Sequence, residues 1–119
     1  MAGRNPPANT PRLYAQDGAG YDAIVHTHYY LGDCNWLITE YDPDEDLAFG
    51  WVRLNGDRQN AELGYVSLAE LRQFRAAIAL NGDRIPNAIA VELDEHWTPC
   101  TLTQGIARID AKDARSSGI

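Results

Sequence analysis

The segment that most constrains the fold is residues 34–51, in which two apolar stretches flank a short acidic turn. Cys34 to Tyr41 and Leu47 to Leu54 have the length and the content of β-branched and aromatic residues that are typical of strands. Asp42-Pro43-Asp44 is a turn sequence, because proline presets φ for the second turn position and aspartate can bond its own backbone. The segment therefore predicts a β-hairpin whose tip carries most of the local negative charge.

Side-chain alternation assigns the residues of this hairpin to the two faces of a sheet. The first strand should present Trp36 and Ile38 on one face, and Leu37, Thr39 and Tyr41 on the other. Gly50, inside the second strand, predicts a bulge or the close approach of another group, since glycine has no side chain to pack. We expect five aromatic side chains in the core, namely Trp36, Tyr41, Trp51, Tyr65 and Trp97.

Further strands are predicted on both sides of the hairpin. Asp22 to Tyr30 is rich in β-branched and aromatic residues, and Ala61 to Val66 follows a polar loop that contains Asn-Gly. The connections between these four successive strands are short, which favours an antiparallel meander. Ala88 to Leu93 has the pattern of a further strand.

The main helix is predicted to begin at Ser67. Ser67-Leu68-Ala69-Glu70 has the sequence of a capping box, in which the serine hydroxyl accepts from the backbone amide of the glutamate. Apolar residues then recur at spacings of three and four, at Leu68, Leu71, Phe74 and Ile78. Asn81-Gly82 should end the helix near residue 80. A second, short helix is predicted over Thr103 to Asp110.

These elements predict an α+β fold, an antiparallel meander of four to five strands with the helix at about 67–80 packed on one face. Residues 1–11 hold three of the six prolines and no apolar period, so we expect a disordered arm. Residues 12–111 should form a single domain, and residues 112–119 a flexible tail.

The amino-acid composition limits the kinds of partner that we expect this protein to bind. With 17 acidic and 10 basic residues the net charge is −7, which disfavours direct binding to nucleic acid or to an anionic membrane and favours a protein partner with a basic surface. No apolar run is long enough to span a bilayer, and the first residues lack the apolar core of a secretory signal, so we expect a cytoplasmic protein. In that compartment Cys34 and Cys100 should be reduced thiols.

Two acidic clusters are the candidate partner-binding residues. The first places five carboxylates within seven positions at the hairpin tip: Glu40, Asp42, Asp44, Glu45 and Asp46. The second consists of Glu92, Asp94 and Glu95. If both lay on one side, they would imitate the charge of a phosphate backbone and dock against arginine and lysine side chains. The alternative is a solubilising rim that discourages edge-to-edge aggregation.

Catalysis and metal binding have weaker signals. Five residues have the chemistry of zinc ligands, namely His26, His28, Cys34, His96 and Cys100, but their spacing is not that of a known zinc module. Glu40 with Asp42 or Asp44 could divide acid and base roles, yet acidic turn residues are usually only solvated. No nucleophile motif or glycine-rich phosphate cradle is present. We therefore predict no metal, no cofactor, no catalytic residues and no enzyme activity.

Several motifs resemble one family. They are Trp36 to Asp44 with its T-E-Y-D-P core, Ala48-Phe-Gly50, Glu62-Leu-Gly-Tyr65 running into Ser67 to Leu71, and Val91 to Trp97. Over roughly residues 12–103 the chain resembles the domain of unknown function 2958, a family of small bacterial proteins often carried by plasmids and other mobile elements.

The resemblance implies a context and supplies no catalytic residues. Small acidic proteins of mobile elements often inhibit host defence complexes, of the CRISPR or restriction kind, by occupying a basic nucleic-acid groove, which would make this protein an acidic DNA mimic. The alternatives are a metal-dependent (zinc) enzyme and a self-associating accessory protein of plasmid transfer or maintenance.

Overall fold

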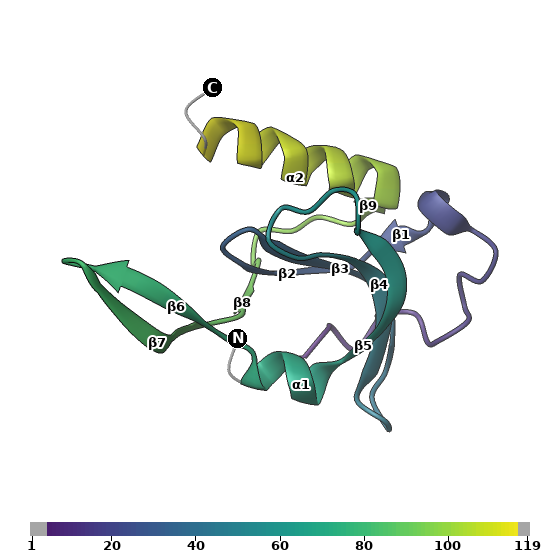
Figure 1. Cartoon of the computed structure of the whole chain (residues 1–119). Helices are drawn as coiled ribbons and strands as arrows, with labels where there is room; N and C mark the ends of the chain where they lie inside the picture. Colours follow the sequence, from purple (N-terminus) through teal and green to yellow (C-terminus); the bar gives the residue numbers. More distant parts are fainter. Residues whose placement is uncertain (1–4, 117–119) are drawn as a thin grey trace.

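An antiparallel five-stranded sheet, in the order β5-β4-β3-β2-β8, organises the computed structural model, which describes residues 5–116 without the side chains of residues 78 and 116 (Figure 1). Its strands are β2 (Thr27–Leu31), β3 (Cys34–Asp42), β4 (Leu47–Arg53), β5 (Glu62–Ser67) and β8 (Glu92–Leu93). The first four follow one another along the sheet, so the predicted α+β class and its antiparallel meander are confirmed.

The remaining elements surround this sheet. A short 3-10 turn, η1 (Gly20–Asp22), precedes β1 (Ile24–Val25), which pairs with β9 (Cys100–Thr101). α1 (Leu68–Gln73) follows β5, and β6 (Arg75–Leu80) pairs with β7 (Asp83–Ala90) in a separate hairpin. The long helix is α2 (Leu102–Ser116). α1 and α2 lie on opposite faces of the five-stranded sheet (Figure 1).

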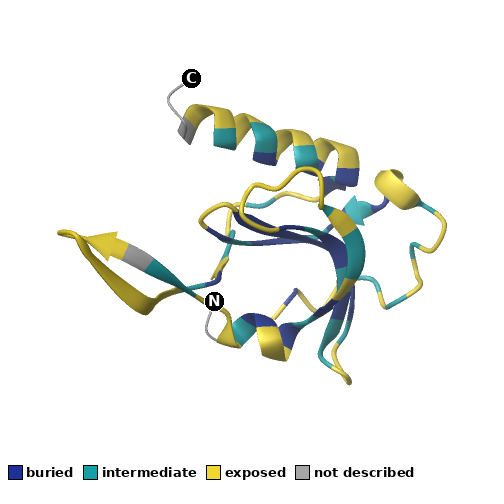
Figure 2. Cartoon of the chain, in the orientation of Figure 1, coloured by how far each residue is buried: buried dark blue, intermediate teal, exposed yellow. Residues whose placement is uncertain are grey.

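Each face of the sheet has its own apolar cluster. On the α1 face, Trp36, Ile38 and Tyr41 pack with Leu68 and Leu71 of the helix. The cluster of the α2 face contains two residues of the sheet and two of the helix, namely Leu37, Trp51, Leu102 and Ile109. β3 contributes to both clusters, and eight of its nine residues, Cys34 to Tyr41, are buried (Figure 2).

A bulge in β3 changes which residues share a face. Ile38 pairs with Gly50, but the next pair is Glu40 with Phe49, so Thr39 is an extra residue without a partner in β4. The alternation shifts by one residue there, and Tyr41 joins the Trp36 face instead of the Leu37 face. The predicted side for Tyr41 is therefore wrong, whereas the close approach predicted at Gly50 is confirmed: a Cβ atom there would lie 2.0 Å from the Leu37 carbonyl oxygen.

The predicted helix over 67–80 is correct only in its first half. Ser67 caps α1, with its hydroxyl accepting from the Glu70 N–H at 3.2 Å, but the backbone is already extended at Phe74. Residues 75–80 are a strand. Asn81 and Gly82 both have positive φ, +53° and +83°, as in the two-residue turns that close hairpins. Asn-Gly therefore closes the β6–β7 hairpin and does not end a helix.

The two ends of the chain also differ from expectation. α2 continues to Ser116, so residues 112–116 are helical where a flexible tail was predicted, and the predicted short helix over 103–110 is the first part of this longer one. Within the predicted disordered arm, Pro6 and Thr10 are buried and the Pro11 carbonyl accepts from the Tyr41 N–H at 2.9 Å. Residues 1–4 and 117–119 lie outside the described residues.

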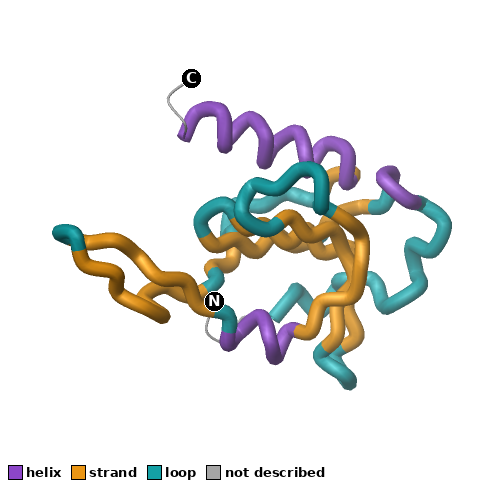
Figure 3. The backbone as a smooth tube through the Cα atoms, in the orientation of Figure 1, coloured by secondary structure: helices purple, strands orange, loops and turns teal. Residues whose placement is uncertain are grey.

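The β6–β7 hairpin projects from the body of the molecule (Figure 2). Leu80 and Ile85 on this hairpin are 52% and 39% exposed, whereas the two clusters of the sheet are closed to solvent. The start of β6 still reaches the sheet, where Ala76 packs against the cluster of the α1 face. On the α2 face, residues of the segment before β1, which Figure 3 traces, lie against the sheet.

Substitution of Gly50 tests whether the close crossing at the bulge is essential. Gly50→Ala should lower the free energy of unfolding by about 3 kcal/mol or more, because the new methyl group meets main-chain atoms that cannot move aside. Gly64→Ala is the matched control, since Gly64 pairs with Gly50 and has open space around it; its change should stay within about 1 kcal/mol. Urea denaturation measures both, and equal effects would contradict the steric argument.

Candidate functional site

Two cross-strand rows of side chains lie on the α2 face of the sheet. Leu37, Trp51 and Leu63 are paired across β3, β4 and β5 and pack beneath α2. Because the bulge shifts the alternation, the next row on the same face is Glu40, Phe49 and Tyr65. This second row is not part of the α2 cluster, and it forms one wall of a pocket.

The pocket has a volume of about 330 Å³ and is closed on its other side by the N-terminal segment. Its walls combine apolar and polar groups from Leu13, Tyr14, Gln16, Asp17, Gly18, Gly20, Ala23, Thr39, Glu40, Phe49, Leu63 and Tyr65. Glu40 is only 5% exposed, and one of its carboxylate oxygens accepts from the backbone N–H of Tyr14. The pocket therefore places a buried carboxylate between aromatic and aliphatic walls.

Gln16 holds the N-terminal segment against the sheet. Its side-chain amide donates at 2.9 Å both to the Ile24 carbonyl and to the carbonyl of the bulged residue Thr39, and its side-chain oxygen accepts from the Ile24 N–H at 2.6 Å. Thr39 has no paired residue in β4, and the bond from Gln16 satisfies its carbonyl, a group that burial would otherwise penalise. One side chain thus fixes the bulge and the outer wall of the pocket together.

Two tyrosines form the rim of the pocket. The Tyr14 and Tyr65 hydroxyl groups are 3.1 Å apart, and the Tyr65 ring packs edge-on against Phe49 with centroids 5.3 Å apart. The hydrogen bond to Tyr14 raises the pKa of Tyr65, and loss of hydration and the negative charges of Glu40 and Asp17 raise it further. Tyr65 is 55% exposed, so its predicted place in the core is wrong.

A second depression of about 530 Å³ adjoins the first and shares Leu13, Tyr14 and Tyr65 with it. Its other lining residues are Arg12, Asp42, Asp44, Glu45 and Leu47. Three of these side chains are carboxylates and one is basic. We call the two depressions together the acidic groove.

The structure divides the five carboxylates of the hairpin tip among three roles. Asp44 and Glu45 are exposed along the groove, and Asp42 lines it while accepting from the Asp44 N–H at 2.9 Å. Glu40 points to the pocket. Asp46 is instead turned towards α1.

Asp46 stabilises the fold and lies outside the groove. It accepts from the Tyr41 hydroxyl at 2.6 Å and from both terminal nitrogens of Arg72 on α1. The hydrogen bonds from Arg72, aided by Tyr41 and opposed by partial burial, lower the pKa of Asp46. Burial, followed by the bond to Asp46, raises the pKa of Tyr41 to about 12. Asp46 is therefore engaged in the contact between the hairpin tip and α1, and its predicted docking role stays a prediction.

The second acidic cluster lies at the other end of the sheet. Glu92 pairs with Tyr30, which pairs with Asn35 at the start of β3, whereas the tip follows Asp42 at its end. Seven residues at about 3.3 Å each separate these ends by roughly 20 Å. Glu92, Asp94 and Glu95 therefore do not join the tip carboxylates in one patch.

Asp94 is engaged in a buried polar contact. Its carboxylate lies 2.9 Å from His28 Nδ1, and His28 Nε2 lies 2.8 Å from the side-chain oxygen of Asn35. Burial acts to raise the pKa of Asp94, but the hydrogen bonds from His28 and the His96 N–H outweigh it, and the pKa is lowered. His28 therefore connects β2, β3 and the segment after β8.

The candidate metal ligands do not converge. His26 is half-buried, with its pKa lowered by burial, and His96 is exposed. Cys34 and Cys100 are buried free thiols, and burial raises the pKa of Cys100. Within residues 5–116 no three His, Cys, Asp or Glu side chains are placed to hold an ion.

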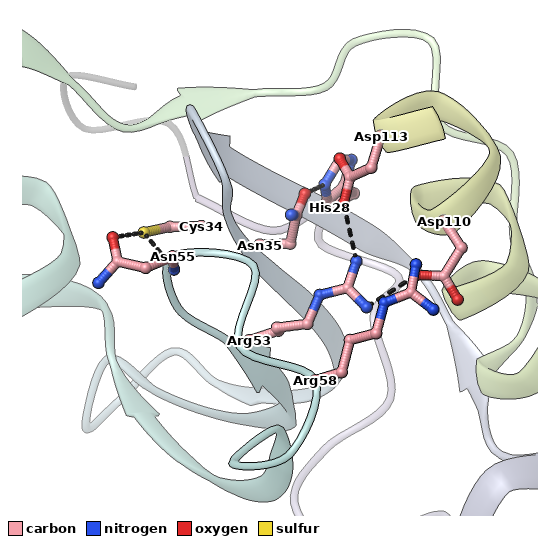
Figure 4. A network of polar contacts seen from close by, with 8 residues as sticks. All are labelled: His28, Cys34, Asn35, Arg53, Asn55, Arg58, Asp110 and Asp113. Atoms are coloured by element: carbon pink, nitrogen blue, oxygen red, sulfur yellow. Dashed lines mark hydrogen bonds and ion pairs between the residues drawn. The ribbon is translucent and has the colours of Figure 1, made fainter. Parts of the chain in front are cut away.

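Arg53 is a buried cation that fastens α2 to the sheet (Figure 4). It is 2% exposed and donates to Asp110 at 2.8 Å and to Asp113 at 3.0 Å, while its guanidinium carbon lies 5.2 Å from the Trp51 ring centroid. Arg58 also reaches Asp110, at 3.3 Å. Sequence patterns did not indicate this cluster, because its members lie about 60 residues apart in the chain.

Sequence reasoning also missed most of the pocket. It selected Glu40 as an acidic tip residue, but it did not place Tyr14, Gln16 or Tyr65 at a site. Tyr14 has a φ of +72°, a backbone conformation that is uncommon for residues other than glycine and that no local sequence pattern predicted. An available signal was Gly50, because a bulge there reverses the side of Glu40.

The structure is that of a small acidic α+β protein with a groove lined in part by carboxylates. The chain belongs to the family described as protein of unknown function (DUF2958), whose match covers residues 8–99. This confirms the family suggested by the sequence motifs. No curated protein and no solved structure matches the chain. In the part of the chain that the structure describes, no helix is long and apolar enough to cross a membrane.

The role assigned to Asp46 predicts a pH-dependent stability difference. A carboxylate with a lowered native pKa stabilises the fold above its unfolded pKa of about 3.9, and this contribution is lost as the pH falls through the native pKa. Asp46→Asn should lower the free energy of unfolding at pH 7 by about 1–2 kcal/mol. The difference from wild type should shrink below about pH 4.

The exposed neighbour supplies the control for this measurement. Asp44→Asn removes one charge from the same turn but no contact with α1, so its stability should follow wild type between pH 7 and pH 3 within about 0.5 kcal/mol. Chemical denaturation at several pH values separates the two variants. If the difference in the free energy of unfolding between Asp46→Asn and wild type were the same at every pH, the stabilising role of the ionised Asp46 carboxylate would be contradicted.

Proposed function

We propose that this chain is a small acidic, non-enzymatic interaction protein that binds a protein partner with a basic surface through the acidic groove. The observation that carries the proposal is the groove itself, in which Asp42, Asp44 and Glu45 line one depression and the buried Glu40 lies in the next. Paired charges of opposite sign steer two proteins together and select the partner.

The class of partner follows from the charge and from the family context. In a bacterial mobile element, the partner we propose is a cytoplasmic nucleic-acid-handling defence complex of the CRISPR or restriction kind, whose basic groove normally receives a phosphate backbone. A net charge of −7 supports attraction to such a groove and opposes direct binding to nucleic acid. The DNA-like surface we propose is limited to the acidic groove, because Glu92 and Glu95 lie at the far end of the sheet.

Charge reversal at the groove tests this proposal. Asp44→Lys with Glu45→Lys should reduce capture of the partner from a nuclease-treated host lysate at least about tenfold, because like charges then face each other. Both side chains are exposed, and their substitution leaves the Asp46 contacts intact. The midpoint of thermal unfolding should therefore stay close to that of wild type.

The control carries the same change in net charge elsewhere. Asp33→Lys with Asp83→Lys alters exposed residues in the β2–β3 turn and at the start of β7, away from the groove, and should retain capture. Added duplex DNA should release the partner from wild-type protein if both compete for one basic surface. Equal losses in the two charge-reversed proteins, or capture that DNA leaves unchanged, would contradict the proposal.

A further inference from the structure

We propose that the pocket at Glu40 binds the guanidinium group of a single arginine side chain supplied by the partner. This inference rests on the proposed function, since the arginine belongs to the protein that docks on the acidic groove. The inference assigns to one residue of the partner a defined pocket within the acidic groove.

The first argument is the state of the Glu40 carboxylate. A carboxylate that is only 5% exposed loses most of its hydration, which costs free energy unless hydrogen bonds or an opposite charge compensate. In the described part of the chain, the hydrogen bond to this side chain comes from the Tyr14 amide, and no Lys, Arg or His is among the lining residues. A cation that enters the pocket therefore meets a dehydrated negative charge with no internal counterion.

The second argument is the chemistry of the walls. Phe49 and Tyr65 present aromatic rings on the same row as Glu40, and Leu13 and Leu63 are aliphatic. Aromatic rings attract cations, and a planar guanidinium stacks on them and gives up water more readily than an ammonium group does. An arginine thus fits with its methylene groups against the leucines and its head at Glu40. A lysine fits less well.

The third argument is size and position. A volume of about 330 Å³ is at the lower end of the range of about 300–1,000 Å³ for ligand pockets, which suits one side chain and not a folded segment. Leu13, Tyr14 and Tyr65 border both depressions, so a side chain that occupies the pocket can have its backbone in the adjoining depression, beside Asp42, Asp44 and Glu45. The two halves of the groove then contact neighbouring parts of one partner.

A binding role also predicts the effect of neutralising Glu40 on stability. Glu40→Gln keeps the shape of the side chain and its acceptor oxygen for the Tyr14 amide, while it removes a buried charge without a counterion. The variant should be as stable as wild type or more stable, as is expected where a residue is retained for binding. This makes it a suitable probe, because loss of binding will not reflect loss of the fold.

The experiment titrates three small probes into 15N-labelled protein and follows the amide signals. N-acetyl-arginine methylamide should shift the signals of Tyr14, Glu40 and Phe49 in a saturable way. The lysine analogue should bind more weakly, and the neutral isostere N-acetyl-citrulline methylamide should not bind. Glu40→Gln should weaken arginine binding at least about tenfold, as expected for loss of a charge-assisted hydrogen bond. Glu62→Gln, an exposed glutamate outside the pocket lining, is the matched control and should bind like wild type.

The outcomes separate this inference from the proposed function. Citrulline shifts equal to those of arginine, shifts confined to Asp44 and Glu45, or unchanged binding by Glu40→Gln would each overturn the pocket assignment. If Glu40→Gln retains partner capture and the Asp44→Lys/Glu45→Lys protein loses it, the proposed function is supported and the role of the pocket in partner binding is overturned. A third outcome is that arginine binds in the pocket, but neither Glu40→Gln nor Asp44→Lys/Glu45→Lys reduces partner capture. That result would support the arginine site and overturn its link to the partner.

Discussion

The bulge at Thr39 is the feature on which the rest of the molecule depends. An extra residue in β3 puts Tyr41 into the α1 cluster and turns Glu40 to the opposite face. Gly50 permits this arrangement because the Leu37 carbonyl occupies the space of its missing side chain. Gln16 completes it by bonding the Thr39 carbonyl, so the N-terminal segment is held where it can form a wall. Core packing, the pocket and the ordering of that segment thus have one cause.

The acidic composition is not spread evenly over one surface. Asp46 is bound to Arg72, Asp94 to His28, and Asp110 and Asp113 to Arg53, so these carboxylates stabilise contacts between elements. Asp44 and Glu45 are exposed where they line the groove. A count of charges in the sequence cannot distinguish these groups, because the difference depends on which cation each carboxylate meets after folding. Charge reversal therefore tests partner binding only at carboxylates that make no such contacts, because reversal of Asp46, Asp94, Asp110 or Asp113 would also disturb the fold.

The sequence predicted the fold class well because the strands are set by local patterns. β3, β4 and β5 lie within one or two residues of their predicted bounds, since turns with proline, glycine and asparagine separate alternating apolar stretches. The error at 74–80 arose because Asn-Gly ends helices and also closes hairpins, and the apolar spacing of this segment fits both. The side of Tyr41 could not be predicted by alternation, since a bulge breaks the period of two. Tyr14 and Gln16 gave no local signal, because their roles depend on contacts with β3 across the fold.

The family match and the groove occupy the same part of the chain. The match covers residues 8–99, which includes all residues that line either depression, whereas α2 begins only at Leu102. The Arg53 contacts with Asp110 and Asp113 therefore join the matched region to a helix outside it. On the shared face of the sheet, the row of Leu37, Trp51 and Leu63 is filled by that helix, while the row of Glu40, Phe49 and Tyr65 is covered by the N-terminal segment and keeps an open pocket. The first row is explained by packing alone, whereas the second row keeps a buried carboxylate beside an open pocket. Burial of a carboxylate costs free energy unless it is compensated, and the cation that we propose for this pocket would compensate it.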